Sequence, residues 1–133
     1  MKDVKIECAV AKIWGVTLVI LIGAVFSFAA WDGKSKTEPS IRIIDGRQFY
    51  QIGTPEELAW FANKVNSKDT ALSAVLTADI DLNSKMWIPI GDTTSHAYDG
   101  VFDGNGFSIR GVSVSNKSYA GLFGVIDLGV VKN

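Results

Sequence analysis

The sequence predicts a mainly β fold: a solenoid of short stacked strands with one α-helix near its start, preceded by an apolar export segment. Three observations lead to this prediction. Residues 54–65 carry the pattern of a capped amphipathic helix. After the helix, short apolar strand patterns recur at intervals of roughly 20 to 30 residues, a spacing typical of solenoid repeats. The 13 Gly and only 3 Pro suit a chain with many tight turns.

The N-terminal segment resembles a secretory signal. Residues 13–30 carry no charge, follow three lysines and end in small residues, which is the usual order of a signal peptide. Ser27-Phe28-Ala29 fits the cleavage pattern best, so we expect residues 1–29 to be removed. The apolar run is also long enough to approach a membrane-spanning helix, so an uncleaved anchor is the alternative. In both cases the following residues are expected outside the cell or at its surface.

Composition excludes several classes of function. A chain of 133 residues has room for one domain. The net charge of −1 gives no basic excess for nucleic acid. Cys8, the single cysteine, lies in the export segment, so the exported part has no thiol for a disulfide or a zinc cluster. We therefore expect no cofactor, no metal and no nucleic-acid partner, with the membrane contacted only through the N-terminal segment.

The segment after the export signal is predicted to be a linker, residues 30–48. Its first ten residues are polar and rich in turn formers. Ile41–Ile44 has the pattern of a short strand, stopped by Asp45-Gly46, and residues 49–52 have the pattern of another. The folded part is expected to span residues 49–133.

The clearest local pattern is a helix start at Thr54. Thr54 is a capping residue, Pro55 suits the first turn, and Glu57 completes a capping box. The apolar positions that follow are spaced as one face of a helix: Leu58, Phe61, Ala62 and Val65. The polar run at residues 66–69 is expected to end the helix.

Strand patterns follow the helix. Apolar and polar residues alternate from Leu76 to Leu82, which predicts one half-buried strand. Residues 87–91 contain Pro89, which bars them from the middle of a sheet. Asp103-Gly104-Asn105-Gly106 is a tight turn by composition, leading into a strand pattern at residues 107–114. Because the chain stops just after an apolar strand-like run, we expect the sequence to be a fragment or a truncated product.

From the helix onward, the chain resembles bacterial surface proteins with GLUG-motif repeats. The resemblance lies in the order of four segments: residues 74–83, 87–91, 98–111 and 120–124. The motif itself is Gly121-Leu122-Phe123-Gly124. The resemblance covers about residues 49–133. It implies a right-handed parallel β-helix, akin to adhesin and pectate-lyase-like folds, in large secreted or cell-wall proteins. The motif also occurs beside protease domains. This chain has one copy where the family usually strings several.

The GLUG motif also makes physical sense in a stacked coil. Gly121 and Gly124 permit close turns, while Leu122 and Phe123 can fill a narrow interior. The amphipathic helix would cover the apolar end and the strand edges of the first coil.

The side chains that could carry catalysis have simpler interpretations. His96 is the only histidine and is expected to be a solvated loop residue. Asp79 and Asp81 share the polar face of a strand, where solvated aspartates are the usual case, so no catalytic pair is predicted. The segment from Asp99 to Gly106 lacks the closing glutamate of an EF-hand.

The predicted function is that of a non-enzymatic exported surface protein, a β-helix scaffold or adhesion module. Its expected partner is a polysaccharide or another cell-surface ligand. Trp87, Tyr98 and Tyr119 are the weak candidates for carbohydrate contact, since aromatic rings can stack on sugars. The alternative is the non-catalytic N-terminal part of a larger secreted polysaccharide lyase, hydrolase or protease.

Overall fold

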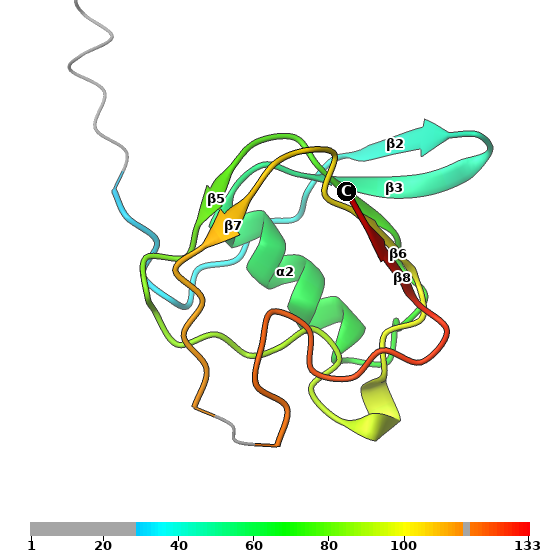
Figure 1. The fold of residues 1–133 in the computed structure, drawn as a ribbon. Helices are drawn as coiled ribbons and strands as arrows, with labels where there is room; N and C mark the ends of the chain where they lie inside the picture. The colour runs from blue at the N-terminus through cyan, green and yellow to red at the C-terminus, as the bar shows by residue number, and fades with distance from the viewer. Residues whose placement is uncertain (1–28, 116–117) are drawn as a thin grey trace, which may run out of the picture. The chain divides into compact units, whose positions relative to one another are not determined.

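A computed structural model describes residues 29–115 and 118–133, and Trp31–Asn133 form one compact unit (Figure 1). Apart from Ala29, the predicted export segment lies outside the described residues, and so do the proposed anchor and most of the cleavage site. Within the described ranges, no helix is long and apolar enough to cross a membrane.

Short strands make up most of the regular structure, together with one α-helix and one 3-10 turn in the described part of the chain. They form a five-stranded sheet in the order β2-β3-β4-β6-β8 and a two-stranded sheet of β5 and β7. Only β2 and β3 pair antiparallel among these neighbours. The predicted mainly β class with one α-helix is thus confirmed. The elements are β2 (Ile41–Ile44), β3 (Arg47–Ile52), α2 (Pro55–Val65), β4 (Ala74–Leu76), β5 (Ile80–Asp81), η1 (Thr94–His96), β6 (Val101–Asp103), β7 (Ile109–Arg110) and β8 (Val130–Lys132).

Strands β2 and β3 form a hairpin around Asp45 and Gly46. Both turn residues have positive φ, 49° and 78°, the conformation that suits a two-residue turn between right-twisted strands. The predicted strand at Ile41–Ile44 and its stop at Asp45-Gly46 are confirmed. Strand β3 begins at Arg47, slightly earlier than the strand expected from the sequence.

The segment predicted as a linker packs against the fold. Trp31 is only 4% exposed, and its ring lies edge-on to the ring of Trp87 at a centroid distance of 6.1 Å. The backbone N–H of Thr37 donates to the carbonyl of Glu56 at 3.1 Å. These contacts, with the hairpin at its end, correct the linker prediction for residues 30–48. The physical reason is that burying one indole ring can fix an otherwise polar segment.

Helix α2 begins as the sequence predicts. Thr54 Oγ1 accepts a hydrogen bond from the backbone N–H of Glu57 at 3.2 Å, and Glu57 Oε2 accepts from the N–H groups of Thr54 and Gly53 at 3.1 and 2.8 Å. This capping box satisfies donors that the first turn leaves unpaired. The predicted apolar face is buried: Leu58, Phe61, Ala62 and Val65.

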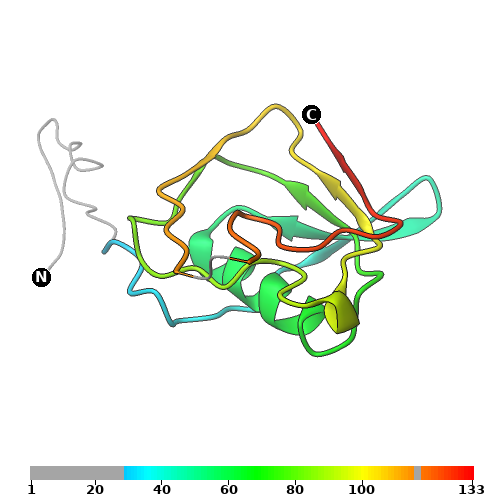
Figure 2. The same ribbon diagram turned by 60° about the horizontal axis from the view of Figure 1, so that its bottom comes forward.

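Parallel pairing joins stretches of chain that are distant in the sequence. In the larger sheet Ala74 pairs with Phe102, and Phe102 pairs in turn with Val131. In the smaller sheet Ile80 pairs with Ile109. Figure 2 shows β6 in yellow and β8 in red side by side. Isolated parallel bridges also join residues outside these strands: Met86 with Ser113, Ile90 with Phe123, and Tyr98 with Ile126.

The single strand expected from Leu76 to Leu82 is divided between two sheets. Strand β4 ends at Leu76 and β5 starts at Ile80, so the chain turns a corner at residues 77–79. The predicted alternation still holds across the corner: Leu76, Ile80 and Leu82 are buried. The side-chain pattern therefore predicted burial correctly, while the backbone changes direction within it.

Phe61 lies at the centre of the core. It is fully buried, and its ring lies 6.0 to 6.3 Å from the rings of Tyr50, Tyr98 and Phe102. Phe123 packs on the same cluster, with ring centroids 5.2 Å from Phe102 and 5.5 Å from Tyr98. One aromatic residue of α2 thus connects residues that belong to successive turns of the chain.

Candidate functional site

A groove of about 410 Å³ lies between residues 31–36, the second half of α2 with the residues just after it, and residues 86–92. We call it the α2 groove. Its apolar lining consists of Trp31, Ala59, Ala62, Met86, Trp87 and Ile88. Its other lining residues are Gly33, Lys34, Lys36, Asn63, Asn66, Ser67 and Asp92.

The floor of the groove is apolar and well fixed. The indole N–H of Trp31 donates to the carbonyl of Ser35 at 3.0 Å, and that of Trp87 donates to the carbonyl of Leu122 at 3.1 Å. Both rings are almost fully covered, at 4% and 3% exposure. The two indoles therefore offer little open aromatic surface to the groove.

Asp32 shapes the segment that forms one wall. Its carboxylate accepts hydrogen bonds from the backbone N–H groups of Lys34 and Ser35 and from the Ser35 hydroxyl, each at 2.7 Å. This turn presents the exposed Lys34 and Lys36 at the rim. A carboxylate held by three donors is strongly favoured over its protonated form.

We expect the pKa of Asp32 to be about 2 in the folded protein, below its ordinary value of 3.8. The main cause is the backbone N–H of Ser35, followed by its hydroxyl and the N–H of Lys34. Because the folded pKa is depressed, the associated stability is present above about pH 4 and is lost as pH falls through 2. NMR titration of the carboxyl group measures this pKa. Ser35→Ala should raise it, and an unchanged value in that variant would contradict the assignment.

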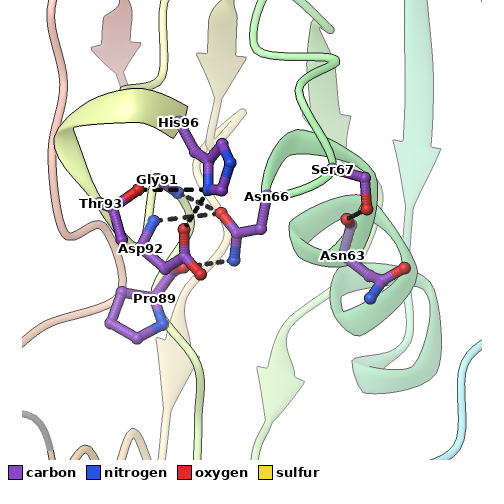
Figure 3. A network of polar contacts seen from close by, with 8 residues as sticks. All are labelled: Asn63, Asn66, Ser67, Pro89, Gly91, Asp92, Thr93 and His96. Carbon is purple, nitrogen blue, oxygen red and sulfur yellow. Dashed lines mark hydrogen bonds and ion pairs between the residues drawn. The ribbon is translucent and has the colours of Figure 1, made fainter.

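Asn66, the residue after α2, joins two parts of the groove lining (Figure 3). Its Nδ2 donates to the carbonyl of Pro89 at 2.9 Å, and its Oδ1 accepts from the backbone N–H groups of Gly91 and Asp92 at 2.9 and 3.1 Å. The amide thus satisfies three backbone groups of a stretch that is distant in the sequence. It ties the end of α2 to residues 89–92.

Asn66→Ala should lower the free energy of unfolding by about 2 kcal/mol, because a part-buried carbonyl and two N–H groups lose their partner. Urea denaturation followed by circular dichroism measures the change. Asn63→Ala, one turn earlier on the exposed side of α2, is the matched control and should change stability by less than about 0.5 kcal/mol. Equal effects of the two variants would contradict the bridging role of Asn66.

His96 is paired rather than freely solvated. Its Nδ1 lies 2.8 Å from Asp92 Oδ1 and 3.2 Å from Thr93 Oγ1 (Figure 3). An ionised carboxylate only accepts, so Nδ1 carries the hydrogen toward Asp92. Both contacts are on the same ring nitrogen and lie within residues 92–96, so this arrangement holds the 3-10 turn η1 in place. The sequence correctly placed His96 in a loop and did not predict its partner.

The motif Gly121-Leu122-Phe123-Gly124 lies against residues 87–91. The Leu122 carbonyl accepts from the backbone N–H of Ile90 at 2.9 Å as well as from the Trp87 indole, and the N–H of Gly124 donates to the Ile90 carbonyl at 2.9 Å. A Cβ at Gly124 would lie 2.5 Å from the carbonyl oxygen of Gly91. A close backbone approach therefore requires the second glycine of the motif.

Two of the three aromatic candidates for carbohydrate contact are core residues. Trp87 is 3% exposed and Tyr98 is 0% exposed, so neither offers a ring face to a sugar. The Tyr98 hydroxyl donates to the Leu72 carbonyl at 2.8 Å, and burial raises the pKa of this phenol. Tyr119 is half-buried and engaged in its own contacts. The three residues therefore do not form a common stacking platform.

Of the residues that build the groove, Trp87 was singled out in the sequence as a sugar contact, and most of the others were not. Trp31 is the one large apolar side chain in the mostly polar segment 31–40, and that isolation was a usable signal that it packs on the fold. Asn66 was assigned only to the helix end, since nothing local indicates its bonds to residues 89–92. Lys34 and Lys36 carry no pattern of their own.

Comparison of the chain with models of protein families, with curated proteins and with solved structures finds no match in any of the three.

Proposed function

We propose that the chain is a non-enzymatic module of an exported surface protein, acting as a scaffold or in adhesion. One observation carries the proposal: separate stretches of chain pair in parallel with the stretch one repeat later, as in Ala74 with Phe102, Ile80 with Ile109, and Tyr98 with Ile126. A stack of similar turns builds a stiff rod with long side faces, which suits a scaffold.

The finer fold that we propose is the start of a right-handed parallel β-helix. Each coil would contain about 29 residues, with β3-β4-β6-β8 on one face, β5-β7 on a second and the isolated bridges on a third. Helix α2 would replace part of the first coil and cover its apolar end. The buried face of α2 and the position of Phe61 among aromatic residues of later turns support this role.

Polar contacts at the same spacing support the coil interpretation. Ser108 N–H donates to Asp79 Oδ1 at 2.9 Å, and Arg110 Nε lies 3.2 Å from Asp81 Oδ2; each pair is 29 residues apart. Asn105 Nδ2 donates to the Leu76 carbonyl at 3.2 Å, also across 29 residues. Residues 29 positions apart thus contact one another through side-chain and backbone atoms. This is what a repeating coil requires.

The link to surface proteins with GLUG repeats rests on the motif and the segment order. We propose that residues 1–29 direct export and that the remainder lies outside the cell or at its surface, anchored there if the segment is not cleaved. Within this proposal the ligand is a polysaccharide or another cell-surface component. The packing of Leu122 and Phe123 on the core is consistent with the structural role that the resemblance implies.

The test combines location, retention and turnover. The full-length chain is expressed in a bacterial host, and its mass and cell fraction are measured; cleavage after Ala29 should give an exported product that begins at Ala30. The product is then mixed with insoluble cell-wall polysaccharides, and both the bound fraction and released reducing sugar are measured. Phe61→Ala, expected to be strongly destabilised, tests whether retention requires the folded protein. Retention in the cytoplasm, or release of sugar, would contradict the proposal.

A further inference from the structure

The α2 groove has features that a scaffold does not require. Met86 and Ile88 stand at its wall with 56% and 63% of their surface exposed. Ala59 and Ala62 on α2 are small and leave depth between the helix and the wall. Large apolar side chains exposed beside a concave site are typical of ligand grooves. Its volume of about 410 Å³ also falls in the usual range of such sites, roughly 300 to 1,000 Å³.

The polar atoms in the groove are mostly engaged by the protein itself. The Asn66 amide is used by backbone groups on residues 89–92, and the Ser67 hydroxyl donates to the Asn63 carbonyl at 2.8 Å. Both indole N–H groups also have carbonyl partners. A sugar would need several free donors and acceptors as well as an open ring face, so the groove suits an occupant with an apolar body.

Two exposed lysines at the rim can meet an anion. Lys34 and Lys36 are lining residues, and the Lys36 ammonium group contacts the Lys34 carbonyl at 3.3 Å. The carboxylate of Asp92, the one acidic lining residue, lies 2.8 Å from His96. Asp32, next to the rim, accepts hydrogen bonds from the N–H groups of its own turn. Both carboxylates keep their negative charge, but their oxygens are hydrogen-bonded within the protein, so the two ammonium groups are what a bound anion would contact.

We propose that the α2 groove binds a small amphipathic carboxylate. Its apolar body would lie against Ala59, Ala62 and Met86, and its carboxylate would lie at Lys34 and Lys36. A ligand of about a dozen non-hydrogen atoms is expected to bind with a Kd on the order of 1 mM. This binding does not depend on export or on the number of coils, so it can fail independently of the proposed function.

The test uses the purified protein with 15N-labelled tryptophan and 4-phenylbutyrate as the probe. Titration should give saturable shifts of the indole N–H signals of Trp31 and Trp87, while Trp60, outside the groove lining, stays unchanged. The uncharged 4-phenylbutyramide should bind at least about five-fold more weakly, since it lacks the attraction to the lysines. Higher salt should weaken the binding of the carboxylate and leave the binding of the amide unaffected.

Charge-matched variants assign the effect to the rim. Lys34→Gln/Lys36→Gln should weaken 4-phenylbutyrate binding at least about five-fold, whereas Arg42→Gln/Lys68→Gln removes the same charge elsewhere and should leave it unchanged. All four residues are exposed, so the fold should persist, and dispersed indole signals check this directly. Absence of shifts at Trp31 and Trp87 up to about 20 mM probe, or equal affinity for the carboxylate and the amide, would overturn the proposal.

Discussion

Replacing Phe61 with alanine is expected to destabilise the protein by about 3–5 kcal/mol, a large part of the stability of a small domain. The side chain is fully buried, and the rings of Tyr50, Tyr98 and Phe102 surround it at 6.0 to 6.3 Å. Its removal leaves a cavity that rigid aromatic neighbours cannot readily fill. Urea denaturation of the purified protein, followed by circular dichroism, measures the loss.

Phe107→Ala is the matched control because it removes the same atoms from a side chain that is 38% exposed. We expect it to cost less than about 1 kcal/mol, since less surface returns to water. If the two variants were equally destabilised, Phe61 would not be the centre of the core.

Gly124→Ala carries the second large effect, about 3 kcal/mol of destabilisation. The added Cβ would lie 2.5 Å from the carbonyl oxygen of Gly91, with Tyr119 and Pro89 side-chain carbons at 3.1 and 3.2 Å. The nearest obstacle is a backbone atom that a hydrogen bond holds in place, since the Gly91 carbonyl accepts from the Val125 N–H at 2.8 Å. The fall in thermal midpoint measures the cost.

Gly121→Ala tests the same motif at its other end. There the nearest atom to an added Cβ is the Phe123 carbonyl oxygen at 3.1 Å, and the next is at 3.9 Å. A shift of a few tenths of an ångström relieves this contact, so we expect a cost below about 1 kcal/mol. A benign Gly124→Ala, or a reversed order of the two variants, would mean that the motif does not pack closely on residue 91.

Local sequence signals predicted helix α2 well. Its start depends on Thr54, Pro55 and Glu57, which lie close together in the chain and interact there. Its buried face follows directly from the helical spacing of Leu58 and Phe61. Such features are correct from sequence because the interactions that cause them are local.

The partners of the strands were harder to predict than the turns between them. Asp103-Gly104-Asn105-Gly106 is the tight turn that its composition predicts, and Asn105 and Gly106 have positive φ, 52° and 80°. However, β6 before it and β7 after it lie in different sheets, and each pairs with strands distant in the sequence rather than with the other. Long-range packing fixes the partner of a strand, and turn composition does not encode it. The same reason explains why the run from Leu76 to Leu82 bends without any break in its alternation.

The α2 groove could not be predicted because its parts come from three distant segments. Trp31 packs against Trp87, and Asn66 binds the Pro89 carbonyl, although the members of each pair are far apart in the sequence. Aromatic residues suggested as sugar contacts became core residues for the same reason: Trp87 and Tyr98 are covered by parts of the chain remote in sequence. The sequence identified the residue types, and long-range packing decided which of them remained accessible.

The most direct test of the central claim is a measurement of strand register by NMR. Nuclear Overhauser contacts between backbone protons of the labelled purified protein should connect β5 with β7, near Ile80 and Ile109, and β6 with β8, near Phe102 and Val131, in parallel order. Those contacts would confirm that successive turns of the chain stack in parallel at a constant spacing. Contacts in antiparallel order between β6 and β7, across the turn at residues 103–106, would instead indicate a local hairpin and would contradict the stacked-coil account.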